Sequence, residues 1–178
     1  MATADQHRVF FALWPDAEVA KTLHRIGACV HGPCGGRLTR RETLHLTLAF
    51  LGATSAERLA DARAAAAAVA GAPFEWQVDR LGYWKHNRIL WAGGESAPLA
   101  AMAAALAAEL RAAGFRLEER PFAAHITLLR DARCRELPPL GGAIAWPVRE
   151  FVLAESRADA AGARYEIIGR WPLGGQLA

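Results

Sequence analysis

Two short stretches of the chain repeat each other and decide its fold: Leu44–Leu48 reads LHLTL, and Ala124–Leu128 reads AHITL. They lie eighty residues apart. Two strand-like apolar segments, Arg8–Ala12 (RVFFA) and Arg88–Ala92 (RILWA), precede them at the same offset. The distance from the first arginine to the histidine is 37 residues in both copies. A repeat this regular predicts a duplicated structural unit.

Each copy of the repeat also contains a helix between its two strands. The apolar residues between the strands change from alternating to helical spacing. Asp16 and Ser96 occupy equivalent positions and are predicted to cap the two helices, and Gly114 is predicted to end the second. The repeated unit is therefore strand, helix, strand, over about 8–52 and 88–130.

The remaining elements lie between and after the two copies. A third helix is expected over 56–70, with a capping box from Thr54 to Glu57 and an end at Gly71. Three strands and two loops complete the expectation: strands over 75–83, 149–155 and 164–171, and loops over 32–36 and 137–142. Because neither loop is long enough to link independent domains, we expect one α+β domain over 1–178, made of two related halves. The pattern leaves the strand directions undetermined.

Composition limits the class of protein. The 178 residues are 53% hydrophobic and 22% charged, which predicts a folded core, and the net charge of +3 by itself indicates no partner. No apolar run is long enough to span a bilayer and the N-terminus does not resemble a secretory signal, so a cytoplasmic location is expected. The three cysteines are odd in number and irregularly spaced, which argues against a disulfide framework. Cys29, His31 and Cys34 match no common zinc spacing, so buried thiols are expected there.

The repeated His-x-Thr suits phosphate chemistry. Side chains at positions i and i+2 of a strand share a face, so His45 emerges beside Thr47, and His125 beside Thr127. If the halves pack about a pseudo-two-fold axis, the two histidines face each other across one cleft. With usual pKa values of about 6.5, one imidazole can accept a proton while the other donates one. The threonine hydroxyls would bind the phosphoryl oxygens, and the natural substrate would be a strained phosphodiester such as a 2′,3′-cyclic phosphate.

Other chemistries fit the sequence less well. A metal site at the two histidines would need a third ligand, and no HExxH pattern accompanies either of them. There is no G-x-S-x-G nucleophile elbow and no GxxxxGK[ST] phosphate loop. We therefore expect neither a metal nor another cofactor.

Four segments carry a resemblance to a known family: Arg8–Pro15, Leu44–Gly52, His125–Leu128 and the tail 155–166. They resemble the RNA 2′,3′-cyclic phosphodiesterases, also called 2′-5′ RNA ligases, of the two-histidine phosphoesterase superfamily. The resemblance covers nearly the whole chain. It implies a bilobal α+β fold with two pseudo-two-fold related lobes, antiparallel-rich sheets flanking a central cleft, and helices outside.

The same resemblance implies an activity and roles for residues. The activity is metal-independent hydrolysis of RNA 2′,3′-cyclic phosphate ends to 2′-phosphomonoesters, with 2′-5′ ligation as the reverse chemistry. In the family the first histidine is the proton donor and the second the acceptor, which corresponds to His45 and His125. From the residues alone the two roles are interchangeable. The expected partner is RNA with a cyclic phosphate end, such as a tRNA half. We expect a monomer with no membrane and no protein partner.

Residues around the two motifs have open interpretations. Family members carry a basic residue after the second motif, here Arg130, whereas Phe50 takes the equivalent place in the first half. Strand alternation puts Arg130 on the face away from His125 unless the strand ends or twists, so it is either a phosphate contact or a solvated charge. Phe11 and Trp91, aligned by the repeat, are either base-stacking or core residues. A basic aromatic patch, made of Trp84, Lys85, His86 and Arg88, either borders an RNA path or forms an exposed hairpin. Arg157 and Tyr165 are interpreted as structural residues.

Two alternative functions remain open from the sequence. One is a non-catalytic module that binds RNA ends or nucleotides, and the other is an esterase for a small cyclic nucleotide. Both would keep the same two motifs.

Overall fold

The computed structural model describes residues 6–159 and 162–174, and it has the expected α+β architecture. Its elements follow the order β1 (His7–Leu13), α1 (Ala17–Cys34), β2 (Arg37–Leu38), a 3₁₀ turn (Arg41–Thr43), β3 (Leu46–Thr54), α2 (Ala56–Ala67), β4 (Phe74–Val78), β5 (Arg80–Trp84), β6 (Ile89–Gly93), α3 (Ala97–Ala112), β7 (His125–Arg130), β8 (Ile144–Val148), β9 (Glu150–Asp159) and β10 (Gly162–Pro172). Among the described helices, none is both long and apolar enough to cross a bilayer.

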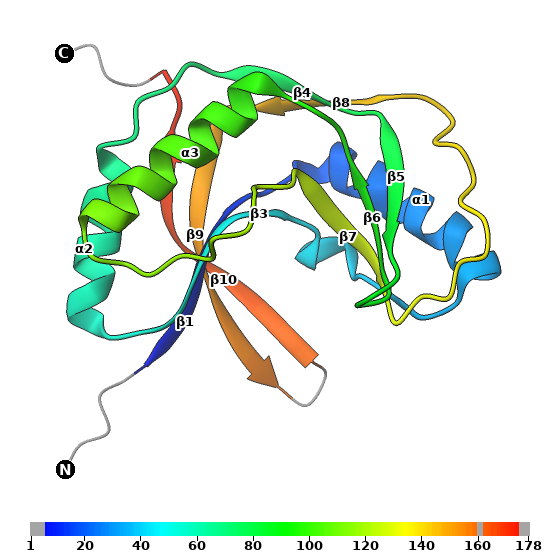
Figure 1. The fold of residues 1–178 in the computed structure, drawn as a ribbon, viewed down its shortest axis with the longest axis horizontal. Coiled ribbons are helices and arrows are strands. Elements are labelled where there is room, and N and C mark those ends of the chain that lie inside the picture. The colour runs from blue at the N-terminus through cyan, green and yellow to red at the C-terminus, as the bar shows by residue number, and fades with distance from the viewer. Residues whose placement is uncertain (1–5, 160–161, 175–178) are drawn as a thin grey trace.

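Two four-stranded sheets form two lobes (Figure 1). The first lobe contains the sheet β10-β9-β1-β3, and the second contains β2-β7-β6-β5. All the strand pairs are antiparallel, which settles the direction that the sequence left open. The predicted fold class, with antiparallel sheets in two lobes, is therefore confirmed.

A short ribbon of two strands, β4 and β8, joins the lobes (Figure 1). Trp76 of β4 lies opposite Trp146 of β8, and their ring centroids are 5.5 Å apart. Trp76 is completely buried and its indole N–H donates to the carbonyl of Gly94 at 3.0 Å. The chain continues from β4 into the second lobe as β5, and from β8 into the first lobe as β9. The pair of tryptophans thus marks the place where the two related halves meet.

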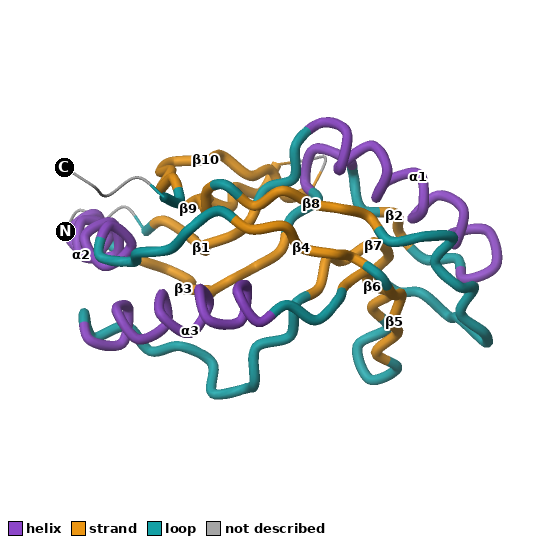
Figure 2. Tube along the Cα trace, turned by 90° about the horizontal axis from the view of Figure 1, so that it is seen from above, coloured by secondary structure: helices purple, strands orange, loops and turns teal. Residues whose placement is uncertain are grey.

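The helix of each repeat packs on the lobe of the other repeat. Helix α1 follows β1 of the first lobe but contacts β7 and β2 of the second, whereas α3 follows β6 of the second lobe and contacts β3 of the first. Gly27 permits the close approach of α1, because a Cβ there would lie 2.8 Å from Leu38 Cδ1 and 3.7 Å from Leu128 Cβ. The view from above shows α1 and α3 on opposite sides of the molecule, with α1 beside β2 and β7 and α3 beside β3 (Figure 2). One core cluster of buried residues consequently runs through both lobes.

The helix ends differ in detail from the prediction. Asp16 caps α1 as expected, accepting from the backbone N–H of Val19 at 2.8 Å, but α1 continues through Pro33 to Cys34 instead of ending in a loop at Gly32. A proline in the last turn removes one helical hydrogen bond near an end where the helix stops anyway. Helix α2 is capped by Ser55 instead of Thr54, and it ends at Ala67.

The strand predictions missed a change of sheet. The segment 75–83 was expected to be one strand, but it is divided at Asp79 into β4 and β5, which pair with β8 and β6 respectively. Alternation of side chains continues across such a change, so the pattern gives no sign of it. The pattern also did not predict β8, which contains Pro147, a residue tolerated in this two-stranded ribbon.

The cysteine prediction was wrong. Cys34 and Cys134 form a disulfide that joins the end of α1 to the segment after β7, and Cys29 is exposed and free. The two bonded cysteines are 100 residues apart in sequence, and only the packing of α1 against β7 brings them together. Spacing arguments do not detect a single bridge of this kind.

Loss of the tryptophan contact between the lobes should destabilise the whole protein. We expect Trp76→Ala to lower the free energy of unfolding by about 3–5 kcal/mol, the range for a fully buried tryptophan. Urea denaturation followed by circular dichroism measures this, with Leu137→Ala as a control because Leu137 is 38% exposed. A loss for Trp76→Ala no larger than the control would contradict the joining role of the β4–β8 ribbon.

Candidate active site

A cavity of about 1000 Å³ lies between the lobes and contains both predicted motifs. Its walls include five predicted site residues: His45, Thr47, His125, Thr127 and Arg130. His45 immediately precedes β3 and Thr47 lies on it, and β7 presents the second pair together with Arg130. Among the described residues, no three His, Cys, Asp or Glu side chains gather in a way that could hold a metal ion.

The two histidines are held in the same way. Nδ1 of His45 lies 2.7 Å from the carbonyl oxygen of Thr43, and Nδ1 of His125 lies 2.8 Å from that of Ala123. A carbonyl can only accept, so each Nδ1 carries hydrogen and donates it. In the neutral state this leaves Nε2 of each ring free to accept a proton, and in the charged state free to donate one.

Aromatic rings enclose the two histidines to different degrees. Trp14 stacks on His45, with centroids 5.2 Å apart and planes at 10°, and Phe10 and Tyr165 contact the same ring at 4.9 and 5.2 Å. On the other side, Trp84 meets the His125 ring edge-on at 4.6 Å. The sequence interpretation gave Tyr165 a structural role and did not single out Phe10 or Trp14 beside His45. No spacing rule links Phe10, Trp14 and Tyr165 to His45, because they come from two different strands and a loop.

This difference in surroundings lowers the two pKa values unequally. Burial lowers the pKa of His45 from its usual 6.5 to about 4, although the hydrogen bond to Thr43 opposes it, and the positive charge of Arg130 adds to the lowering. Burial also lowers the pKa of His125, again with Arg130 adding to the effect. Both imidazoles are therefore neutral at pH 7.

Arg130 reaches the cleft because β7 contains a β-bulge. Thr127 pairs with Trp91 of β6 but Leu129 pairs with Leu90, so Leu128 is an extra residue without a partner in the ladder. Leu128 and Leu129 are both buried. The bulge reverses the alternation after Thr127 and places Arg130 among the cavity residues, where simple alternation would have turned it away. Strand β3 has the same bulge at Leu48, which puts Phe50 at the equivalent place.

The end of β7 is fixed by several contacts. Arg37 of β2 pairs with Arg130 in the strand ladder. The preceding residue, Gly36, has φ +86° and lies so close to β7 that a Cβ there would be 2.4 Å from the Arg130 carbonyl oxygen. The next residue, Asp131, binds Arg37 at 3.0 Å and Arg88 at 3.0 Å. These contacts join β2 and the β5–β6 turn to the strand end that carries Arg130.

The two copies of the repeat differ by one residue in how their first strands, β1 and β6, pair with β3 and β7. Ala12 lies opposite Thr47, but Trp91, and not Ala92, lies opposite Thr127. A shift of one residue reverses the faces of a strand. Phe11 is accordingly completely buried in the core, and its interpretation as a base-stacking residue is wrong. Trp91 packs against Trp84, with centroids 5.4 Å apart, and is not among the residues that line the cavity.

The basic aromatic patch is divided in the structure. Trp84 and His86 line the cavity, while Arg88 binds Asp131 at its rim. The patch therefore belongs to a hairpin that also borders the cavity, and its place along an RNA path stays a prediction.

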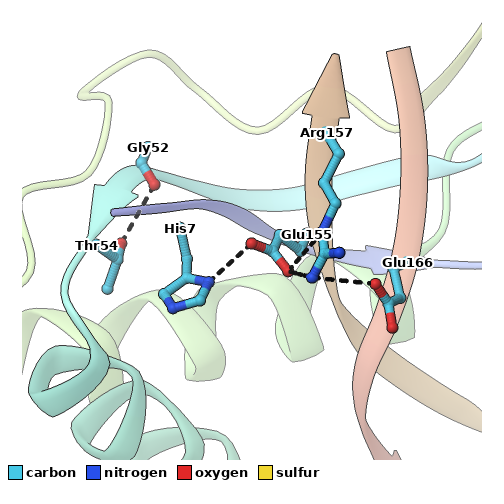
Figure 3. A network of polar contacts seen from close by, with 6 residues as sticks. All are labelled: His7, Gly52, Thr54, Glu155, Arg157 and Glu166. Atoms are coloured by element: carbon cyan, nitrogen blue, oxygen red, sulfur yellow. Dashed lines mark hydrogen bonds and ion pairs between the residues drawn. The ribbon is translucent and has the colours of Figure 1, made fainter. Parts of the chain in front are cut away.

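Arg157 belongs to a polar network on the first lobe (Figure 3). It donates to Glu155 at 2.9 Å and lies 3.3 Å from Glu166, and His7 binds the other oxygen of Glu155 at 2.7 Å. Burial by itself raises the pKa of Glu155, but the hydrogen bonds from His7 and Arg157 outweigh it and lower the pKa below its usual value. The network joins β1, β9 and β10, which agrees with the structural role expected for Arg157.

Comparison with known proteins identifies the family. The family model described as LigT like Phosphoesterase matches residues 13–91 and 94–165. The chain is 34% identical over 173 residues to the RNA 2′,3′-cyclic phosphodiesterase of Escherichia coli K12, covering 96% of this chain and 98% of that protein, and 29% identical to the enzyme of the same name from Thermus thermophilus, covering 95% and 91%. The crystal structure of E. coli LigT complexed with 3′-AMP superposes with a TM-score of 0.89, covering 96% of this chain and 99% of that one. The chain therefore belongs to the LigT-like phosphoesterase family.

Proposed function

We propose that this protein hydrolyses the 2′,3′-cyclic phosphate at the 3′ end of RNA to a 2′-phosphomonoester. The observation that carries the proposal is that one cavity contains both His-Thr pairs and Arg130, with Nε2 of each imidazole free. Its relatives named RNA 2′,3′-cyclic phosphodiesterase support the reaction and the substrate class.

In the proposed reaction the two imidazoles exchange protons with the substrate. One neutral imidazole takes a proton from water as the water oxygen attacks phosphorus. The other, protonated, gives its proton to the 3′ oxygen as the bond between phosphorus and that oxygen breaks, and the phosphate stays on the 2′ oxygen. The hydroxyls of Thr47 and Thr127 donate to the non-bridging oxygens, and the Arg130 guanidinium stabilises their charge. The pair of histidines ends with one proton, as it began, with the positions exchanged.

The order of the two pKa values indicates which histidine acts as the acid and which as the base. His45 has the more enclosed ring and its pKa is about 4, so a single proton on the pair resides on His125. This order suits His125 as the acid and His45 as the base for ring opening. The family resemblance implies the opposite assignment, so the two roles stay open to the experiment described in the Discussion.

The lowered pKa values predict an acidic optimum for kcat/KM, which reports the free enzyme. The singly protonated pair exists between about pH 4 and the lowered pKa of His125, so kcat/KM should rise as the pH falls from 7 and decrease below about 4. A bound phosphate is negative and neutralises Arg130, which raises both pKa values, so the kcat profile should lie at higher pH. Steady-state rates on cytidine 2′,3′-cyclic phosphate test this, and a kcat/KM optimum above pH 7 would contradict it.

The direct test of the function uses a defined RNA. The purified protein is incubated with EDTA and an oligonucleotide that ends in a 2′,3′-cyclic phosphate, and the product is analysed for the position of the phosphate. We expect a 2′-phosphate, formed at the same rate with and without EDTA. Binding without product would favour the non-catalytic module, a 3′-phosphate would exclude the proposed direction of ring opening, and loss of activity with EDTA would exclude a metal-independent reaction.

Several finer expectations belong to the same proposal. We propose tRNA halves as natural substrates, 2′-5′ ligation as the reverse reaction in the same cavity, and action as a monomer without a cofactor. A cytoplasmic location also remains a prediction. The Cys34–Cys134 disulfide is a feature more frequent in oxidising compartments, so titration of free thiols in freshly lysed cells tests that location.

A further inference from the structure

The cavity extends well beyond the catalytic residues, along one side of α3. Helix α3 and the segment between α3 and β7 form this part, which we call the α3 groove and define by Ala104, Ala107, Arg111, Leu117, Arg120 and Phe122. In Figures 1 and 2 that segment returns along α3 toward the start of β7. Other cavity residues on α3 begin at Ala100, and at 1.5 Å per residue the helix from Ala100 to Arg111 is about 16 Å long. The α3 groove is thus longer than a single nucleotide at the catalytic histidines needs.

Exposed aromatic side chains collect on this side of the cavity. Among the described residues, three large hydrophobic side chains are exposed: Phe50 at 43%, Phe122 at 37% and Leu137 at 38%. The two phenylalanines line the cavity and the leucine does not. Arg8 lies over one face of the Phe50 ring at 5.8 Å, so that face is occupied within the protein. Exposed phenylalanines in a groove are suited to stacking on unpaired bases.

Positive charge accompanies these rings. Arg111 and Arg120 line the α3 groove, which leads through Phe122 and Ala123 to His125. Glu118 also lines the groove, and its carboxylate lies 2.7 Å from the Arg120 guanidinium. This ion pair orients the arginine, whose side chain is the longer of the two. A groove with arginines and aromatic rings is the combination that binds single-stranded nucleic acid.

The opposite side of the cavity is already engaged by protein contacts. Arg37 binds Asp131, and Arg40 donates to the carbonyl of Ala163 at 2.5 Å. Trp84 is packed against Trp91 and His125. The equivalent bulges add a second asymmetry, because one places Arg130 and the other places Phe50 in the cavity wall. On the α3 side, by contrast, the Phe122 ring and the Arg111 guanidinium have no such contact among the described residues, and Arg120 is paired only with the exposed Glu118.

We propose that the α3 groove binds the single-stranded RNA immediately 5′ of the cyclic phosphate. The terminal base lies against Phe50, the preceding base stacks on Phe122, and Arg111 and Arg120 contact backbone phosphates of the RNA. The substrate class is then an RNA with at least two unpaired nucleotides at its 3′ end, and a cyclic mononucleotide uses only part of the site. This inference rests on the proposed function and specifies its substrate.

The test compares two substrates that share one reacting group. The values of kcat/KM are measured on cytidine 2′,3′-cyclic phosphate and on a short unstructured RNA ending in the same cyclic cytidylate. The wild-type protein should prefer the RNA, and this preference should weaken as the salt concentration rises. Phe122→Ala should reduce kcat/KM on the RNA at least fivefold more than on the mononucleotide, and Arg120→Ala should act in the same direction and reduce the salt dependence.

Matched controls come from the same chain. Arg116→Ala removes an exposed arginine from the same segment that does not line the cavity, and Leu137→Ala removes the exposed leucine away from it, so both should leave both substrates unaffected. If the wild type hydrolyses both substrates equally well, or if Phe122→Ala slows both by the same factor, the α3 groove does not bind RNA although the proposed function stands. If the wild type hydrolyses neither substrate, the proposed function itself fails.

Discussion

Replacing either His45 or His125 by alanine is expected to slow hydrolysis of an RNA 2′,3′-cyclic phosphate by about 10²- to 10⁴-fold, the usual contribution of one general acid or base. Each imidazole presents a free Nε2 to the same cavity because its Nδ1 is occupied by a backbone carbonyl. Neither can replace the other, since the reaction needs one proton acceptor and one donor at the same time. The measurement is kcat on a saturating concentration of the cyclic-phosphate RNA.

The control for these variants is His24→Ala, because His24 lies on α1 and does not line the cavity. It should retain full activity. Circular dichroism and urea denaturation of the two active-site variants establish that they are folded. A folded His45→Ala or His125→Ala protein with wild-type kcat would remove the acid–base mechanism.

A substrate that needs no protonated leaving group separates the two roles. Bis(4-nitrophenyl) phosphate releases nitrophenolate, which leaves without a proton. The variant that lacks the acid should therefore lose much less activity on this diester than on the RNA, whereas the variant that lacks the base should lose activity on both. Selective retention of activity by His125→Ala would agree with the order of the two pKa values, and selective retention by His45→Ala would agree with the assignment implied by the family.

Much of the fold and the centre of the site could be predicted from the sequence because both are properties of the repeat. Strand alternation places His45 beside Thr47 and His125 beside Thr127, and the equal spacing in both copies implies that the pairs meet. The structure places all four in one cavity. Local periodicity is enough to place each histidine beside its threonine, because only one residue separates the two.

The features that sequence reasoning missed depend on contacts between distant segments. The bulges at Leu48 and Leu128 reverse the strand faces without any change in residue pattern, so the position of Arg130 could not be decided. The exchange of α1 and α3 between the lobes, and the Cys34–Cys134 bond that depends on it, follow from how the two halves pack. The pairing of Trp76 with Trp146 had one visible signal, since each tryptophan precedes a valine by two residues in a short apolar segment.

Arg130→Ala is expected to reduce kcat/KM on the cyclic-phosphate RNA by about 10²- to 10³-fold, the range for loss of one group that stabilises charge in the transition state. The guanidinium would pair with the non-bridging phosphoryl oxygens, and lysine cannot reproduce that planar fork. Arg130→Lys should therefore recover part of the loss, and Arg116→Ala, with the same charge change outside the cavity, should lose nothing.

The pH profile distinguishes this role from a structural one. The charge of Arg130 contributes to the lowered pKa values of His45 and His125, so its removal raises both toward 6.5. A raised pKa keeps the imidazole protonated to higher pH, which should move the kcat/KM profile of Arg130→Ala toward neutral pH, whereas Arg130→Lys should leave it close to that of the wild type. A variant that loses activity with no displacement of its profile would show that Arg130 holds the end of β7 in place instead of placing its charge beside the reacting phosphate.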